Sequence, residues 1–177
     1  MYRERNDNSR KHYSETLSLV PESKRVYVDE TGFDAPLIRE YAYTQVGQRV
    51  LGERTGKRFA CTSLIAGLKE GTPLAPMEFK GYCNTDVVLT WVQEMLIPSL
   101  KPGDVVIWDN ATFHKSNRLA QAFEQAGIGV IFLPPYSPDL NPIEQFWACL
   151  KAWIRSLNQP YLHISQALTK VFGNINA

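Results

Sequence analysis

Three acidic residues stand where their carboxylates could act together. Asp29 and Asp109 each follow a short apolar segment, and Glu144 lies in the first turn of a helix-like segment. In open α/β sheets, chemistry collects at the carboxyl ends of strands, so the two aspartates would meet if their strands lie adjacent and parallel. Three carboxylates repel one another unless a cation lies among them, and hard divalent cations take oxygen ligands. Such a cluster predicts a site whose bound cations activate the attacking oxygen and stabilise the leaving oxygen of a phosphodiester.

Each acid also has a structural interpretation. Asp29 would bind the turn that follows its strand, and Asp109 would be a turn or cap residue. Asn141 is a natural helix N-cap and Pro142 suits the first helical position, so Glu144 would complete a capping box. Spacing alone leaves the structural and the catalytic interpretations open.

Hydrophobic periodicity predicts the elements that must position these acids. The predicted helices cover residues 8–20 (stopped by Pro21), 84–98 (ended by Pro98), 114–126 and 141–157, with one more helix within 159–177. The predicted strands cover residues 25–29 (ended by a turn at 30–32), 58–68, 74–81, 105–108 and 128–133. Strand, helix and strand between residues 105 and 133 form a right-handed crossover with a parallel pair. Together with the earlier antiparallel strands, this pattern predicts a mixed α/β sheet.

Composition and charge exclude several classes of protein. The 177 residues carry 19 basic and 18 acidic side chains, a net charge of +1, which argues against holding nucleic acid by bulk charge alone. Basic residues gather between Arg39 and Arg58, where a solvated loop competes with a nucleic-acid contact. The three cysteines are too far apart for a disulfide framework or a metal clip, which indicates reduced thiols in a cytoplasmic protein. We find no apolar run of about 20 residues and no secretory signal, so no membrane association is predicted.

Three segments together resemble a known family. They are the runs Tyr-Val-Asp-Glu-Thr-Gly-Phe at 27–33, Val-Ile-Trp-Asp-Asn-Ala-Thr-Phe-His at 106–114 and Leu-Pro-Pro-Tyr-Ser-Pro-Asp-Leu-Asn-Pro-Ile-Glu at 133–144. The 34 residues between Asp109 and Glu144 also resemble the family's spacing. In order and spacing the segments resemble the catalytic domain of DDE transposases of the Tc/mariner superfamily, in its bacterial insertion-sequence branch.

The resemblance implies a fold, a reaction and a set of partners. It implies an α/β, ribonuclease H-like (retroviral-integrase-like) fold with a mixed five-stranded sheet of order 3-2-1-4-5, flanked by helices. It implies that Asp29, Asp109 and Glu144 are catalytic and bind two Mg²⁺ or Mn²⁺ ions. Double-stranded DNA would be cut at transposon ends and joined to target DNA, by a homodimer assembled on the DNA in the bacterial cytoplasm, at the nucleoid.

Four further residues are candidate DNA contacts. Asn110 and His114 match the family's stretch after the second acid, and His114 would contact DNA, orient a carboxylate or pack at a helix start. Tyr136 would stack on a base or pack against the proline-rich loop. Lys151, near the helical face of Glu144, would hold a phosphate or be solvated. The tryptophans at 108, 147 and 153 are predicted to be core residues.

The predicted organisation is a leading helix or linker at residues 1–20, a catalytic domain at 21–158, and a C-terminal helix or truncated tail at 159–177. Family members usually carry N-terminal helix-turn-helix modules, and too few residues precede the first strand for one. The chain would therefore be a catalytic fragment, the second frame of a split element with a separate N-terminal DNA-binding half, or a degenerate copy. Two other functions stay open: a ribonuclease H-like nuclease that does not transpose, and an inactive remnant that acts as a DNA-binding or assembly module.

Overall fold

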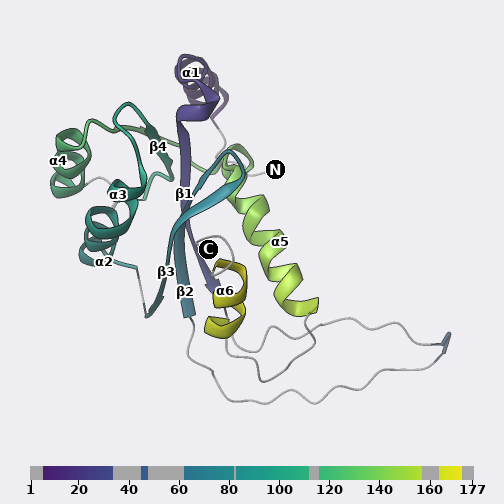
Figure 1. The fold of residues 1–177 in the computed structure, drawn as a ribbon. Helices are drawn as coiled ribbons and strands as arrows, with labels where there is room; N and C mark the ends of the chain where they lie inside the picture. Colours follow the sequence, from purple (N-terminus) through teal and green to yellow (C-terminus); the bar gives the residue numbers. More distant parts are fainter. Residues whose placement is uncertain are drawn as a thin grey trace.

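Five strands form one mixed sheet in the order β3-β2-β1-β4-β5 (Figure 1). The computed structural model describes residues 6–33, 45–47, 62–81, 83–111, 116–156 and 164–172. The strands are β1 (Arg25–Phe33), β2 (Thr62–Lys69), β3 (Thr72–Lys80), β4 (Val105–Trp108) and β5 (Gly129–Phe132). The first three are antiparallel, whereas β1, β4 and β5 run parallel. The predicted sheet order and ribonuclease H-like architecture are confirmed.

Helices cover both faces of this sheet (Figure 1). They are α1 (Asp7–Ser18), α2 (Thr85–Trp91), the π-helical turn η2 (Val92–Leu96), α3 (Ile97–Ser99), α4 (Asn117–Gln125), α5 (Pro142–Ser156) and α6 (Ile164–Phe172), with 3₁₀ turns η1 (Glu22–Lys24) and η4 (Pro138–Leu140). The α2–η2 segment and α4 pack on one face, and α5 and α6 pack on the other. Helix α1 packs beside β4, through the buried Tyr13 against Ile107 and Leu133.

Strand alternation divides β1 between these two layers. Val26 and Val28 are fully buried under α2 and α4. Tyr27 and Phe33 belong to the opposite face, where Phe33 packs with residues of α5 and α6. Asp29 has the same parity as Tyr27 and Phe33, so the sheet presents it to α5.

The end of β1 differs from the prediction. The expected turn at residues 30–32 is strand, because β1 pairs with β2 from Tyr27 opposite Leu68 through Phe33 opposite Thr62. Backbone pairing overrides the turn preference of the Glu-Thr-Gly run. The strands predicted at 58–68 and 74–81 are joined by Glu70 and Gly71, both with positive φ (48° and 77°), as a two-residue hairpin requires.

Helix bounds differ from the prediction at three proline-rich or capped positions. Helix α1 ends at Ser18, before Pro21. The helix expected to end at Pro98 continues to Ser99. Its second half is the π-helical turn η2, followed by α3, and Pro98 lies in the first turn of α3. Helix α4 begins at Asn117 instead of 114, because the Ser116 hydroxyl accepts a hydrogen bond from the Arg118 backbone N–H at 3.2 Å.

Two of the three tryptophans predicted to be core residues are buried, and a C-terminal helix is present. Trp108 and Trp147 are buried as predicted, whereas Trp153 is 39% exposed, so its core assignment is wrong. The predicted C-terminal helix is present as α6, and its Phe172 is buried in the layer of α5. Apart from residues 45–47, the basic segment Arg39–Arg58 lies outside the described residues. In the described part of the chain, no helix is long and apolar enough to cross a membrane.

Candidate active site

The register of β1 and β4 brings two of the acids level with each other. The two strands are parallel, with Tyr27 opposite Ile107. Asp29 and Asp109 each follow this pair by two residues, so they lie on the same face at adjacent positions. The predicted parallel neighbours are confirmed. Asp29 lies in the middle of β1, not at its end, because β1 continues along β2 after its pairing with β4 is over.

Helix α5 brings the third acid to the same place. Asp29, Asp109 and Glu144 all line one cleft of about 360 Å³, whose other described lining residues are Asn110, Ala111, Leu133, Pro134, Pro135, Tyr136, Ser137, Pro138 and Asn141. The buried Ile143 and Leu150 hold α5 against β1 and β2. The side chain of Glu144, on the first turn of α5, is left exposed. Residues far apart in sequence thus share one site.

Asp29 is a partly buried carboxylate among other acids. Its Oδ2 accepts a hydrogen bond from the Trp147 indole Nε1 at 3.1 Å. Burial raises the pKa of Asp29 to about 8, and the negative charges of Glu144, Glu30 and Asp109 add to this effect. Because Asp29 lies within a strand and bonds to α5, the turn interpretation is wrong for this residue.

Asp109 makes a turn contact and also lines the cleft. Its Oδ1 accepts a hydrogen bond from the Ala111 backbone N–H at 3.2 Å, as a turn residue does. The same carboxylate lines the acid cleft. This local bond orients Asp109 after β4 and leaves its catalytic interpretation open.

The capping box expected at the start of α5 does not form. The Asn141 side-chain Nδ2 donates to the Val28 carbonyl of β1 at 3.4 Å, a long bond, and the Asn141 backbone N–H donates to Pro138 O at 2.9 Å. The Glu144 carboxylate therefore does not reach back to this N–H, and it accepts no hydrogen bond from a described residue. The structural interpretations of Asn141 and Glu144 are both wrong, and Glu144 is left available for the cleft.

The structure places two of the four candidate DNA contacts in the cleft. Asn110 and Tyr136 line the cleft, and Tyr136 is 56% exposed with a positive φ of 55°. That exposure disfavours the packing interpretation of Tyr136. Lys151 does not line the cleft; its Nζ lies 5.6 Å from the ring centroid of Phe33. His114 lies outside the described residues.

The sequence predictions missed the site roles of two residues, Trp147 and Asn141. Trp147 was expected only in the core, yet it donates to Asp29. A buried indole N–H needs an acceptor, and Trp147 lies one turn after Glu144, which was the available signal. Asn141 was expected to cap α5 but instead joins the start of α5 to β1.

The acid cleft suits divalent cations in the chemistry of its donors. Hard cations take carboxylate oxygens, and no Lys, Arg or His is among the described lining residues to neutralise the three acids. Burial is the largest cause of the raised pKa of Asp29, and repulsion from Glu144, Glu30 and Asp109 contributes to it. As the described residues stand, no group of three His, Cys, Asp or Glu side chains is placed to hold a metal ion.

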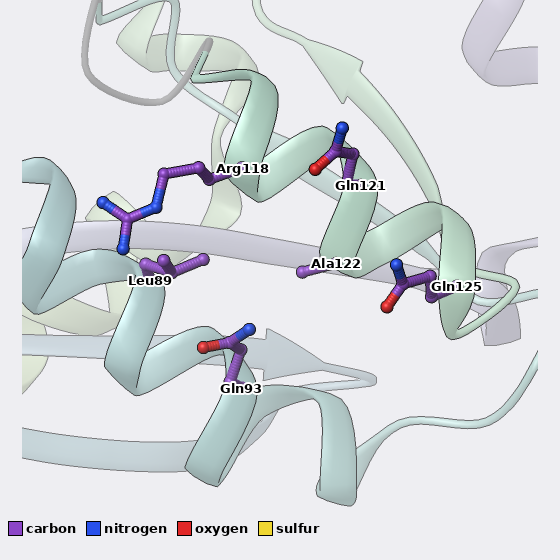
Figure 2. A pocket seen from close by; sticks show the side chains of 6 residues that line it. All are labelled: Leu89, Gln93, Arg118, Gln121, Ala122 and Gln125. Atoms are coloured by element: carbon purple, nitrogen blue, oxygen red, sulfur yellow. The ribbon is translucent and has the colours of Figure 1, made fainter.

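A second hollow, of about 270 Å³, lies between the α2–η2 segment and α4 (Figure 2). Its lining side chains are Leu89, Gln93, Arg118, Gln121, Ala122 and Gln125. They include no carboxylate, thiol or hydroxyl that could act as a nucleophile, base or metal ligand. The acid cleft is therefore the better candidate for catalysis.

Sequence comparison identifies the family. The profile of the DDE superfamily endonuclease family matches residues 24–166, which include all three acids. This chain belongs to the DDE superfamily endonuclease family. It is 42% identical to the Tc3 transposase of Caenorhabditis elegans over 53 residues, which are 30% of this chain and 16% of that protein.

Solved structures agree with this family. The Mos1 strand transfer complex matches with a TM-score of 0.73 and 20% identity, over 96% of this chain and 54% of the Mos1 chain. The mariner Mos1 paired-end complex with Mg matches with a TM-score of 0.62 and 16% identity, over 96% of this chain and 61% of the other. The DDE chain described here therefore spans a little more than half the length of these Mos1 chains. Its fold is similar to that of the Mos1 chains.

Proposed function

We propose that this DDE domain cuts DNA at transposon ends and joins the freed ends to target DNA. One observation carries the proposal: three acids from β1, the end of β4 and α5 line a single cleft. The simple structural roles fail for Asp29 and Glu144. Membership of the DDE endonuclease family, whose profile spans all three acids, supports this assignment.

Asp29, Asp109 and Glu144 would hold two Mg²⁺ or Mn²⁺ ions. Mos1 structures with Mg and with Mn support this choice of cation. When bound, such ions activate the attacking oxygen and stabilise the leaving oxygen of a phosphodiester, so one site serves cleavage and joining. Trp147 keeps the Asp29 carboxylate in place, and the Ala111 N–H does the same for Asp109.

Double-stranded DNA is the proposed substrate. The exposed ring of Tyr136 offers a stacking surface for a base at the rim of the cleft, and the side chain of Asn110 offers hydrogen bonds. His114 and Lys151 remain candidate contacts further from the acids. We place the chain in the bacterial insertion-sequence branch of the Tc/mariner superfamily, on its resemblance at residues 133–144. It would act as a homodimer with a separate N-terminal DNA-binding half, at the nucleoid in the cytoplasm.

The first test is nicking of supercoiled plasmid by the chain with Mg²⁺ or Mn²⁺. We expect cation-dependent nicking by the wild type and a loss of at least about 100-fold in Asp109→Asn, because one ligand of the site is removed. Asp86→Asn, a change at an exposed aspartate of α2, serves as the matched control and should nick like the wild type. Nicking of equal rate in Asp109→Asn would contradict the proposal.

The same assay separates the alternatives. A ribonuclease H-like nuclease would prefer an RNA–DNA hybrid to duplex DNA, and it would give no joined product. An inactive remnant would bind DNA without cutting it, also when an N-terminal half of a related element is added in trans.

A further inference from the structure

One buried polar atom in the acid cleft has no partner. Asn141 is 5% exposed, and its Oδ1 accepts no hydrogen bond in the described part of the chain. The orientation of this amide follows from its other bond, because the Val28 carbonyl accepts hydrogen bonds and so must face the Nδ2 group. The oxygen is therefore the atom left over. Buried polar atoms are satisfied in native proteins by protein or by water, so a missing partner indicates a ligand or an ordered water.

The surroundings restrict what this partner can be. The cleft that Asn141 lines contains Asp29, Asp109 and Glu144, but no Lys, Arg or His among its described residues. The described donors that line the cleft, the Asn110 amide and the Tyr136 and Ser137 hydroxyls, do not bond to this oxygen. Around a bound cation the three acids are ionised and only accept hydrogen bonds, and so do the phosphate oxygens of DNA. An oxygen such as Asn141 Oδ1 needs a donor. A hydrated divalent cation brings one, because Mg²⁺ keeps several waters when it binds to carboxylates.

We propose that Asn141 is a further residue of the cation site, whose Oδ1 accepts a hydrogen bond from a water of the hydrated ion. This inference rests on the proposed function, since the ion is the one that the three acids would bind. Two hydrogen bonds hold Asn141 in a position that suits this role. Its Nδ2 is bonded to Val28, the neighbour of Asp29, and its backbone carbonyl accepts from the N–H of Glu144 at 3.1 Å.

Asn141 is thus a positioning residue between two of the acids. It joins the strand that carries Asp29 to the first turn of the helix that carries Glu144. One residue is therefore bonded to both of the elements that carry these acids. Residues that bond to the shell around a metal ion typically contribute 10- to 100-fold to its affinity.

The test is the affinity of the whole chain for Mn²⁺ without DNA, measured by the electron paramagnetic resonance signal of the free ion. Asn141→Ala removes the oxygen and the Val28 bond, and we expect Mn²⁺ binding to weaken by about 10- to 100-fold. Asn141→Asp loses the Val28 bond but keeps an oxygen, and should bind Mn²⁺ at least as tightly as the wild type. Asn141→Ser, a neutral variant that keeps a shorter oxygen, should lie between the wild type and Asn141→Ala, and it takes the place of Asn141→Asp if that variant does not fold.

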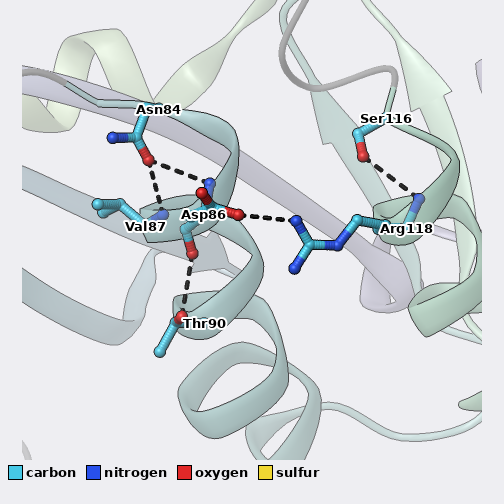
Figure 3. A network of polar contacts seen from close by, with 6 residues as sticks. All are labelled: Asn84, Asp86, Val87, Thr90, Ser116 and Arg118. Carbon is cyan, nitrogen blue, oxygen red and sulfur yellow. Dashed lines mark hydrogen bonds and ion pairs between the residues drawn. The ribbon is translucent and has the colours of Figure 1, made fainter.

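Asn84→Ala is the matched control. Asn84 is also an asparagine before a helix, and its side-chain oxygen accepts from the backbone N–H groups of Asp86 and Val87 at 3.0 Å, away from the acid cleft (Figure 3). Its loss weakens a helix cap without touching the site, so Mn²⁺ affinity should stay within about twofold of the wild type.

The outcomes separate this inference from the proposed function. Wild-type affinity in Asn141→Ala, or equal weakening in the alanine variant and in the oxygen-bearing variants, would overturn the role of Asn141 Oδ1. Absence of Mn²⁺ binding by the wild type, or equal binding by Asp109→Asn, would instead contradict the cation site of the proposed function itself.

Discussion

At the scale of single residues, Asp29 is an acid whose ionised form is unfavourable in its surroundings. It is a partly buried carboxylate with one hydrogen bond from Trp147 and with three other acids near enough to raise its pKa. An incompletely compensated buried charge costs stability. Active sites commonly keep such a cost because the charge is needed for function.

Asp29→Asn should therefore make the protein more stable while it abolishes nicking. The amide has the size of the carboxylate, carries no charge and still offers an oxygen to the Trp147 N–H. We expect a gain of roughly 1–3 kcal/mol in the free energy of unfolding, measured by urea denaturation at pH 9 in EDTA. The pKa of about 8 in the folded protein lies above the ordinary 3.8, so the charge cost appears as pH rises from about 4 to about 8 and the gain grows over that interval.

Asp86→Asn is the control for this stability measurement. Asp86 is exposed and pairs with Arg118 at 2.7 Å on the surface (Figure 3). Loss of that pair should change stability by less than about 0.5 kcal/mol. An Asp29→Asn protein less stable than the wild type at pH 9 would show that the carboxylate is compensated.

The acids could be located from sequence, but their immediate partners could not. Apolar segments before Asp29 and Asp109 predict parallel strands, and the parallel register then brings both acids together. The bonds of Asn141 and Trp147 instead join residues 113 and 118 positions apart in the chain. Such contacts depend on how α5 packs on the sheet. Local spacing favoured a capping box that tertiary packing does not form.

At the scale of elements, α1 is attached to the loop that precedes α5. Arg10 of α1 forms a bidentate pair with Asp139 of η4, with Nη1–Oδ1 and Nη2–Oδ2 distances of 3.0 and 2.6 Å. The Arg10 side chain is 13% exposed, and the neighbouring Tyr13 is buried against Ile107 and Leu133. Helix α1 therefore braces the proline-rich loop that carries Tyr136 and leads to Glu144.

Arg10→Gln should loosen this loop and slow nicking. Bidentate pairs with a partly buried arginine contribute more than ordinary surface pairs, so we expect a loss of about 1 kcal/mol in unfolding free energy. Nicking should fall several-fold because Glu144 is held less firmly. Arg118→Gln, which breaks the exposed pair with Asp86, is the matched control and should cost less than about 0.5 kcal/mol. Equal effects of the two variants on stability and nicking would contradict a bracing role for Arg10.

The sequence predicted the existence and order of the elements better than their ends. The leading helix was expected, but its attachment to Asp139 was not, because the Ser-Pro-Asp-Leu run indicates a turn on its own. Strand β1 passes through a predicted turn because β2 supplies partners for residues 30–33. The start of α4 follows the cap at Ser116, a signal that was present in the sequence but was not used in the prediction.

At the scale of the whole molecule, an aspartate lies at each end of β4, and the two aspartates have different neighbours. Asp109 follows the strand and lies in the acid cleft with Asp29 and Glu144. Asp104 precedes the strand and is fully buried, with Lys69 Nζ at 2.6 Å, Lys24 Nζ at 3.4 Å and the Lys101 backbone N–H at 3.0 Å. One end of β4 thus carries an aspartate that is paired with lysines, whereas the other end carries an aspartate that lies among other acids.

Asp104 should account for part of the acid sensitivity of the fold. Burial raises the pKa of Asp104, but hydrogen bonds from Lys69 and Lys101 and the lysine charges outweigh this and hold it below its ordinary value. A lowered pKa gives stability that is present above about pH 4 and is lost as pH falls through the folded-state value. Asp104→Asn should cost about 3 kcal/mol at pH 7, because Lys69 loses its partner. Urea denaturation between pH 2 and pH 6 should then show a shallower loss of stability in the variant, and parallel curves would refute the role of Asp104.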